Sequence, residues 1–89
     1  MSWRLFVLEH YTGHGDAPEP VPSLPDGVRL LMAVHLPADE VVLALVESPD
    51  EGTAVAAAVA AGWRVDRVGP AEWYPVRLAD ETIAEGLRT

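Results

Sequence analysis

The chain of 89 residues contains no cysteine, which excludes disulfide bonds, cysteine metal sites and a cysteine nucleophile. Lysine, asparagine and glutamine are also absent, and the six basic residues, all arginine, are outnumbered by fourteen acidic ones. A net charge of −8 argues against nucleic acid and anionic membranes as partners, because both bind basic patches. No apolar run approaches the ~18–20 residues of a membrane span, and the first run is too short for a signal peptide. We therefore expect a cytoplasmic protein.

Apolar residues, by contrast, are abundant. They make up 49% of the chain, at the top of the range for a single globular domain. A domain of this length buries only about 60–65% of the surface that its unfolded chain exposes, so its own core is small. We expect part of the apolar surface to be hidden against a second copy of the chain, which predicts a homodimer.

Three apolar runs predict strands. Trp3–Tyr11 carries hydrophobic residues on both alternating faces, which is typical of a strand covered on both sides. Glu40–Glu47 is the most continuously apolar run, so we place it at the centre of the sheet. Val28–His35 is half-polar and more typical of an edge, and only a short turn separates it from the central run, which favours an antiparallel hairpin. One face of that strand would carry Val28, Leu30, Met32 and Val34.

A helix is predicted after the third strand. In Ser48–Glu51 the serine would cap the helix, the proline would take its first position and the glutamate would complete a capping box. Val55 and Val59 lie four residues apart on one face with Ala58 beside them, and Gly62 would supply a left-handed stop. The many alanines would let this helix approach its sheet closely.

The rest of the chain is rich in proline. A fourth strand is expected from about Val65, with Val68, Trp73 and Val76 as its apolar positions. Its prolines confine it to a sheet edge or a bulged path. Residues 79–89 would form a short helix capped by Asp80 or a disordered tail, which leaves one domain over residues 1–78. Thr12–Gly27 holds four prolines and cannot run as an α-helix, so this loop is either functional or disordered.

The order of these elements predicts an α+β, ferredoxin-like βαββαβ domain whose first helix is replaced by the Pro-rich loop. Its four-stranded antiparallel sheet would have strands one and three in the centre and strand four at an edge.

Two junctions resemble a known group. Val42–Glu51 resembles the strand-to-helix junction of small actinobacterial ferredoxin-like proteins, one branch of which binds nickel, and Ala60–Val68 resembles the helix-to-last-strand junction of the same group. The resemblance covers roughly Val28–Val76. It implies a relative of the dimeric α+β-barrel superfamily, in which two sheets pack face to face and enclose a cavity.

The three histidines are candidate metal ligands. His10 ends the first strand, His14 follows it closely, and His35 ends the second strand. Strands one and two are parallel in the expected topology, so His10 and His35 would lie at one end of the sheet, about 10 Å apart across strand three. Three imidazoles near carboxylates would suit Ni, Zn or Cu. The alternative is that each histidine is a solvated strand-end residue.

A small organic ligand is the second candidate. Aromatic rings gather on or beside the strands, and such rings with one cationic side chain would suit a flat molecule. The residues proposed to bind it are Tyr11, Arg29, Trp73 and Tyr74. Core and dimer packing would use the same rings.

We therefore expect a small-molecule-binding or metal-binding accessory protein that dimerises through its sheet. One alternative, by analogy with the fold, is a cofactor-free cyclase, isomerase or monooxygenase-like enzyme of secondary metabolism, in which a histidine acts as general base near Tyr11 or Arg29. Another is a purely structural protein. No catalytic triad, phosphate-binding glycine loop or paired carboxylates are evident, so no catalytic residue is assigned.

Overall fold

The computed structural model describes residues 3–13, 19–25 and 27–77. It contains, in chain order, β1 (Arg4–Tyr11), β2 (Arg29–Leu36), the short 3₁₀ turn η1 (Pro37–Asp39), β3 (Val41–Ser48), α1 (Glu51–Ala60) and β4 (Arg67–Pro70). The domain boundary at residue 78 and the tail helix expected from Asp80 lie outside the described residues.

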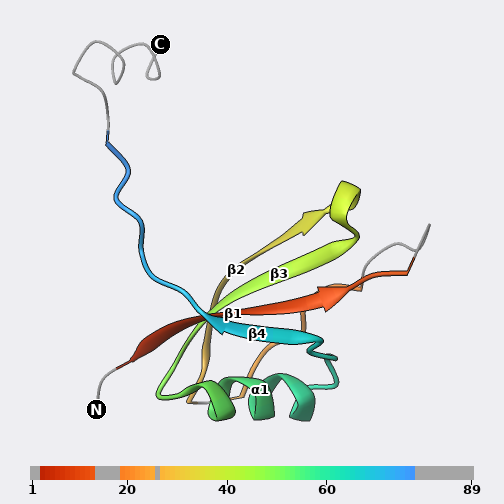
Figure 1. Ribbon diagram of the computed structural model, residues 1–89. Coiled ribbons are helices and arrows are strands. Elements are labelled where there is room, and N and C mark those ends of the chain that lie inside the picture. The colour runs from red at the N-terminus through yellow and green to blue at the C-terminus, as the bar shows by residue number, and fades with distance from the viewer. Residues whose placement is uncertain (1–2, 14–18, 26, 78–89) are drawn as a thin grey trace, which may run out of the picture.

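The four strands form one antiparallel sheet in the order β2-β3-β1-β4. This confirms the α+β class and the central position of β1 and β3, and it is compatible with a ferredoxin-like fold. Helix α1 lies against one face of the sheet, and no other described helix or strand covers the opposite face (Figure 1). None of the helices in the described ranges is long and apolar enough to cross a membrane.

The start of α1 differs from the prediction. The helix begins at Glu51, and its N-cap is Asp50, whose side chain accepts a hydrogen bond from the Thr53 amide at 2.7 Å. Ser48 is instead the last, buried residue of β3, and its hydroxyl donates to the Asp50 carbonyl at 2.8 Å. The capping role assigned to Ser48 and the helical position assigned to Pro49 are therefore wrong, because the strand continues through Ser48, one residue further than expected.

The face that α1 turns to the sheet is made of alanine. Its buried residues are Ala54, Ala57 and Ala58. Of the three residues that the sequence grouped on one face, Ala58 is buried, Val55 packs at the margin of the core and Val59 is 59% exposed. The small side chains allow the close approach of helix and sheet. Gly62 has a φ of 86° and ends the helix as predicted.

An irregularity in β2 divides its apolar residues between the two faces of the sheet. Leu30 pairs with the buried Val46, whereas Met32 pairs with Leu45, so Leu31 has no partner in the register. One extra residue in a strand moves every later side chain to the other face. The prediction of a single shared apolar face is therefore wrong. Val28 and Leu30, before the bulge, pack toward α1, whereas Met32 and Val34, after it, lie on the opposite face.

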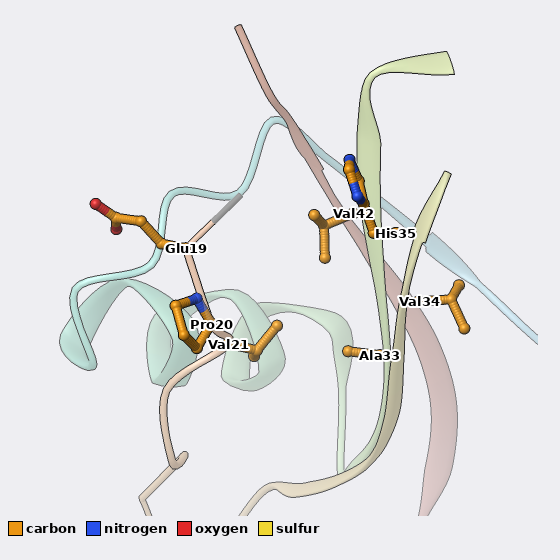
Figure 2. Close-up of a pocket in the computed structure, with 7 residues that line it drawn as sticks. All are labelled: Glu19, Pro20, Val21, Ala33, Val34, His35 and Val42. Atoms are coloured by element: carbon orange, nitrogen blue, oxygen red, sulfur yellow. The ribbon is translucent and has the colours of Figure 1, made fainter. Parts of the chain in front are cut away.

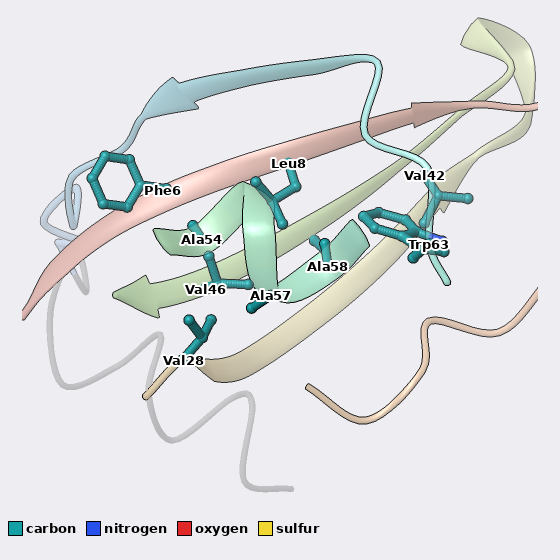
Figure 3. Close-up of a cluster of buried hydrophobic side chains, with 10 residues drawn as sticks. Phe6, Leu8, Val28, Val42, Val46, Ala54, Ala57, Ala58 and Trp63 are labelled. Carbon is teal, nitrogen blue, oxygen red and sulfur yellow. The ribbon is translucent and has the colours of Figure 1, made fainter. Parts of the chain in front are cut away.

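The core lies between α1 and the sheet. Figure 3 shows its main members: Phe6, Leu8, Val28, Val42, Val46, Ala54, Ala57, Ala58 and Trp63. Within one chain β1 is buried on this side only, because Leu5 and Val7 remain half-buried and Trp3 is 51% exposed. Within the described ranges, β1 is therefore not covered on both sides as the sequence suggested.

Strand β4 lies at the edge of the sheet, as its prolines predicted. It is shorter than expected, beginning at Arg67 and ending at Pro70, so Trp73 and Val76 are not strand residues. Ala71 still donates to the Leu5 carbonyl at 2.9 Å, but from residue 71 to residue 77 the chain has no regular secondary structure.

Candidate functional site

Two of the three histidines are placed on either side of the same residue. His10 on β1 and His35 on β2 are both register partners of Val42 on β3. Directly opposed residues in antiparallel strands point to the same face, so both imidazoles share the face that carries α1. Two inter-strand spacings separate their backbones by about 10 Å, as expected from the sequence. His14 lies outside the described residues.

The ring of His10 is held in one orientation. It stacks on the indole of Trp63, with ring centroids 5.1 Å apart and planes inclined by 16°. Its Nδ1 lies 2.7 Å from the carbonyl oxygen of Arg64. A carbonyl can only accept, so Nδ1 carries the proton in this contact. In the neutral ring the lone pair of Nε2 is then available to a ligand, a proton or a metal ion.

The connection from α1 to β4 is tied to the end of β1 by a small polar network. The guanidinium of Arg64 donates to the Tyr11 carbonyl at 2.6 Å, and the Tyr11 amide donates to the carboxylate of Asp66 at 2.8 Å. Arg64 and Asp66 also form an ion pair at 3.1 Å. The hydrogen bond from Tyr11, followed by the contact with Arg64, lowers the pKa of Asp66. This network positions Trp63 beside His10.

The low pKa of Asp66 predicts a loss of stability in acid. Because the pKa lies below its ordinary value of 3.8, the ionised carboxylate stabilises the fold fully above that value. That contribution is lost as the pH falls through the lower, folded-state pKa. We expect Asp66→Asn to lower the thermal midpoint at neutral pH and to flatten its decline below about pH 4. Melting curves recorded at several pH values across this range measure the thermal midpoint, and Asp39→Asn is the control. If the midpoints of both variants fall equally as the pH is lowered, the prediction is wrong.

A groove lies on the α1 side of the sheet, between the end of the β2–β3 hairpin and the Pro-rich segment. We call it the helix-side groove (Figure 2). It has a volume of about 220 Å³, is open to solvent, and is lined by Glu19, Pro20, Val21, Ala33, Val34, His35 and Val42. The side chain of Val34 points away from the groove, toward the opposite face of the sheet (Figure 2). The described part of the β1–β2 connection contains no helix, and the groove lies along that segment. Most of the residues that line the groove are apolar, and the polar ones are a carboxylate, Glu19, and an imidazole, His35.

The indole nitrogen of Trp63 is an unpaired buried donor. Trp63 is 3% exposed, and within the described ranges its Nε1 has no hydrogen-bond partner. Trp63 is not one of the residues that line the helix-side groove. An unsatisfied buried donor costs about 1–3 kcal/mol, so an acceptor placed there would recover that free energy.

The residues that the sequence suggested for an organic ligand are not brought together. Tyr11 and Arg29 pair with Val41 and Glu47, six residues apart on β3, so they lie about 20 Å from each other. Trp73 and Tyr74 follow β4 and are 67% and 84% exposed. These four residues therefore do not form one pocket in a single chain.

The expected pairing of a histidine base with Tyr11 or Arg29 is also not assembled around His10. Tyr11 follows His10 in the same strand and so points to the opposite face. Its hydroxyl donates to Glu9 at 2.9 Å, and this contact raises the pKa of Tyr11 above its ordinary value. Arg29 forms an ion pair with Glu47. Neither side chain faces the imidazole of His10.

The predicted metal site has two placed histidines. Structural zinc sites use four protein ligands and catalytic sites usually three. Among the residues that the structure describes, no group of three His, Asp or Glu side chains could hold a metal ion. Because His14 is not described, the three-histidine site stays a prediction.

The face opposite α1, which we call the open face, carries exposed apolar side chains along β1 and β2. Those exposed by more than a third are Trp3, Tyr11, Met32, Val34 and Leu36. Its charged side chains are paired: Arg29 with Glu47, and Arg67 with Glu9 at 3.8 Å. A cavity of about 330 Å³, lined by Trp3, Arg29 and Glu47 among the described residues, lies at one end.

Trp63 is one of the aromatic rings that the sequence placed beside the strands, but it was not among the four residues proposed to bind the ligand. A signal was present, because Trp63 directly follows Gly62, and a glycine stop after a helix returns the chain toward the sheet. The register that sets His10 and His35 opposite Val42 could not be read from the sequence. Comparison with protein-family models, with curated proteins and with solved structures gave no match. The resemblance to small ferredoxin-like proteins therefore stays a prediction, and function is argued from the geometry alone.

Proposed function

We propose that this protein is a small-molecule-binding homodimer, in which a second copy covers the open face and the helix-side groove takes the ligand. The observation that carries the proposal is the difference between the two faces of one sheet. One face is covered by α1 and leaves a groove beside the Pro-rich segment, and the other keeps a row of apolar side chains in solvent.

A second copy of the chain is the occupant that suits the open face. Met32 is 56% exposed and Val34 is 45% exposed, and contiguous apolar surface of this kind is typical of an interaction site. The chain has a net charge of −8, yet the two arginines and two glutamates of this face form ion pairs with each other. Repulsion between two acidic copies is therefore smallest when they meet here.

The helix-side groove is the better of the two ligand cavities for such a dimer. The cavity beside Trp3 lies on the face that the second copy would cover, and its Arg29 is already paired with Glu47. The groove lies on the other side of the sheet and would stay accessible. The side chains of Glu19 and His35, which line it, are exposed to solvent. In the metal-binding form of this proposal, His10 and His35 would bind the ion together with His14.

Sedimentation velocity of the unmodified protein tests the dimer. Each chain has a mass of 9.6 kDa, so a dimer sediments with twice that mass. We expect the dimer to dominate at micromolar concentration and to persist at high salt, because apolar burial rather than charge would hold it. A single monomeric species at every concentration would overturn this part of the proposal.

A further inference from the structure

The segment that follows β4, residues 71–77, forms an exposed apolar arm. It carries Trp73, Tyr74 and Val76, which are the three most exposed large hydrophobic side chains in the described ranges, at 67–85%. A single exposed hydrophobic residue is ordinary on a protein surface. Three of them within four residues, two of which are aromatic, are typical of a segment that contacts another molecule.

The arm leaves the sheet on the side of the open face. Its first residue, Ala71, donates to the Leu5 carbonyl at 2.9 Å, so the arm begins beside β1 at the β4 edge. From there it runs away from the sheet, on the side opposite α1 (Figure 1). The arm contains no turn or bend, and the proline after Tyr74 keeps that residue out of the helical region. The arm is therefore directed away from its own sheet and toward a neighbouring molecule.

The charge of the arm suits an acidic partner. The chain has a net charge of −8, but the only charged residues of the arm are Glu72 and Arg77, whose charges cancel. The two arginines and two glutamates of the open face also form ion pairs with each other. An arm can therefore lie on the open face of a second copy without adding charge repulsion.

The arm is also long enough and apolar enough for this role. An extended segment of its length reaches about 23 Å, and the outer strands of a four-stranded sheet lie about 14 Å apart, so the arm can cross the sheet of a partner. Aromatic side chains bury about 150–250 Å² each. Trp73 and Tyr74 together would then supply about a third of the ~800 Å² that each partner contributes to a standard interface.

We infer that two copies of the chain exchange their arms, so that Trp73 and Tyr74 of each copy pack on the open face of the other. In a two-fold dimer both arms make the same contact, and exchange of a segment between identical chains is a low-cost route to such a dimer. The inference deepens the proposed function, because it rests on the dimer and names the segment that each copy contributes. It does not depend on the ligand.

Replacing Trp73 by alanine tests the contribution of the arm. Truncation of an aromatic side chain at the centre of a contact typically costs enough to weaken a complex about 10-fold or more, and sedimentation velocity over a range of concentrations should show this loss. Trp73 lies outside the sheet and the core, so the variant should keep its fold. Val59→Ala, which truncates an exposed apolar side chain of α1, is the control and should leave the dimer unchanged. Equal dimer affinities in the two variants would overturn the inference.

A spin label on the arm tests where it packs. The chain has no cysteine, so Val76→Cys provides a single attachment site. Spin-labelled copies without isotopes are mixed with isotope-labelled copies without the spin label, so that any broadening is intermolecular. The methyl resonances of Met32 and Leu45, on the open face, should broaden, whereas those of Ala54 and Ala58, buried beneath α1, should not.

Two results of the spin-label experiment would overturn the inference. One is equal broadening of all four methyl resonances, or of none, at concentrations where sedimentation shows a dimer, and the dimer itself would then still stand. The other is broadening of Met32 and Leu45 only when the spin label and the isotopes are on the same chain, which would mean that each arm covers its own sheet. A chain that stays monomeric at every concentration would instead reject the dimer of the proposed function, and the arm exchange with it.

Discussion

Replacing Leu8 by alanine is expected to lower the free energy of unfolding by about 2–5 kcal/mol. Leu8 is completely buried in β1, between its register partners Ala44 on β3 and Val68 on β4, and beneath α1 (Figure 3). The facing helix surface is made of alanine, so no larger side chain is present to fill the space that the substitution opens. Small domains have about 5–15 kcal/mol of stability in total, so this is a large share.

Urea unfolding followed by circular dichroism measures the effect, at one fixed protein concentration because dimerisation would add to stability. Val59→Ala is the matched control, since it also removes methyl groups but from a helix residue that is 59% exposed. We expect the control to change the unfolding midpoint little. A Leu8→Ala midpoint no lower than that of the control would mean that β1 and α1 do not pack as described.

Replacing Leu45 by glutamate is expected to weaken the proposed dimer by about 100-fold or more, because an unpaired charge buried in an interface costs several kcal/mol. Leu45 lies on the central strand β3 and pairs with Val7 on one side and Met32 on the other, so it is in the middle of the open face. In a two-fold dimer the same substitution enters the interface twice. Sedimentation velocity should then show monomer at concentrations where the unmodified chain is dimeric.

The control for Leu45→Glu is Val59→Glu, which adds the same charge to the exposed side of α1, on the other face of the sheet. Both variants raise the net negative charge by one, so a difference between them reports position rather than charge. The Val59→Glu variant should remain dimeric. Dissociation of both variants to the same extent would show that general charge repulsion, and not the open face, controls association.

The arrangement of the sheet was largely predictable from the apolar pattern. The continuous runs in β1 and β3 indicated central strands, because such strands meet apolar neighbours on every side. Prolines indicated that β4 is an edge strand, since a residue without an N–H cannot complete an inner ladder. The expected parallel relation of β1 and β2 placed His10 and His35 at the same end of the sheet, and the register confirms it.

The details that build the candidate site were not predictable in the same way. The bulge at Leu31 has no marker in the sequence, yet it decides that Met32 and Val34 belong to the open face. The buried residues of α1 are alanines rather than valines, because small side chains let the helix pack closely against the sheet. Helix capping moved from Ser48 to Asp50 because β3 extends through Ser48. Each of these depends on contacts between distant segments.

The sequence by itself determined the class of the fold, the order of its strands and the excess of apolar surface, because these follow from local periodicity and composition. Only the tertiary structure decided where that excess lies and which polar atoms face each other. The stacking of His10 on Trp63 joins residues more than fifty positions apart, and it depends on Gly62, Arg64 and Asp66 returning the chain to the end of β1. Such pairings are set by packing and register, which no local pattern encodes.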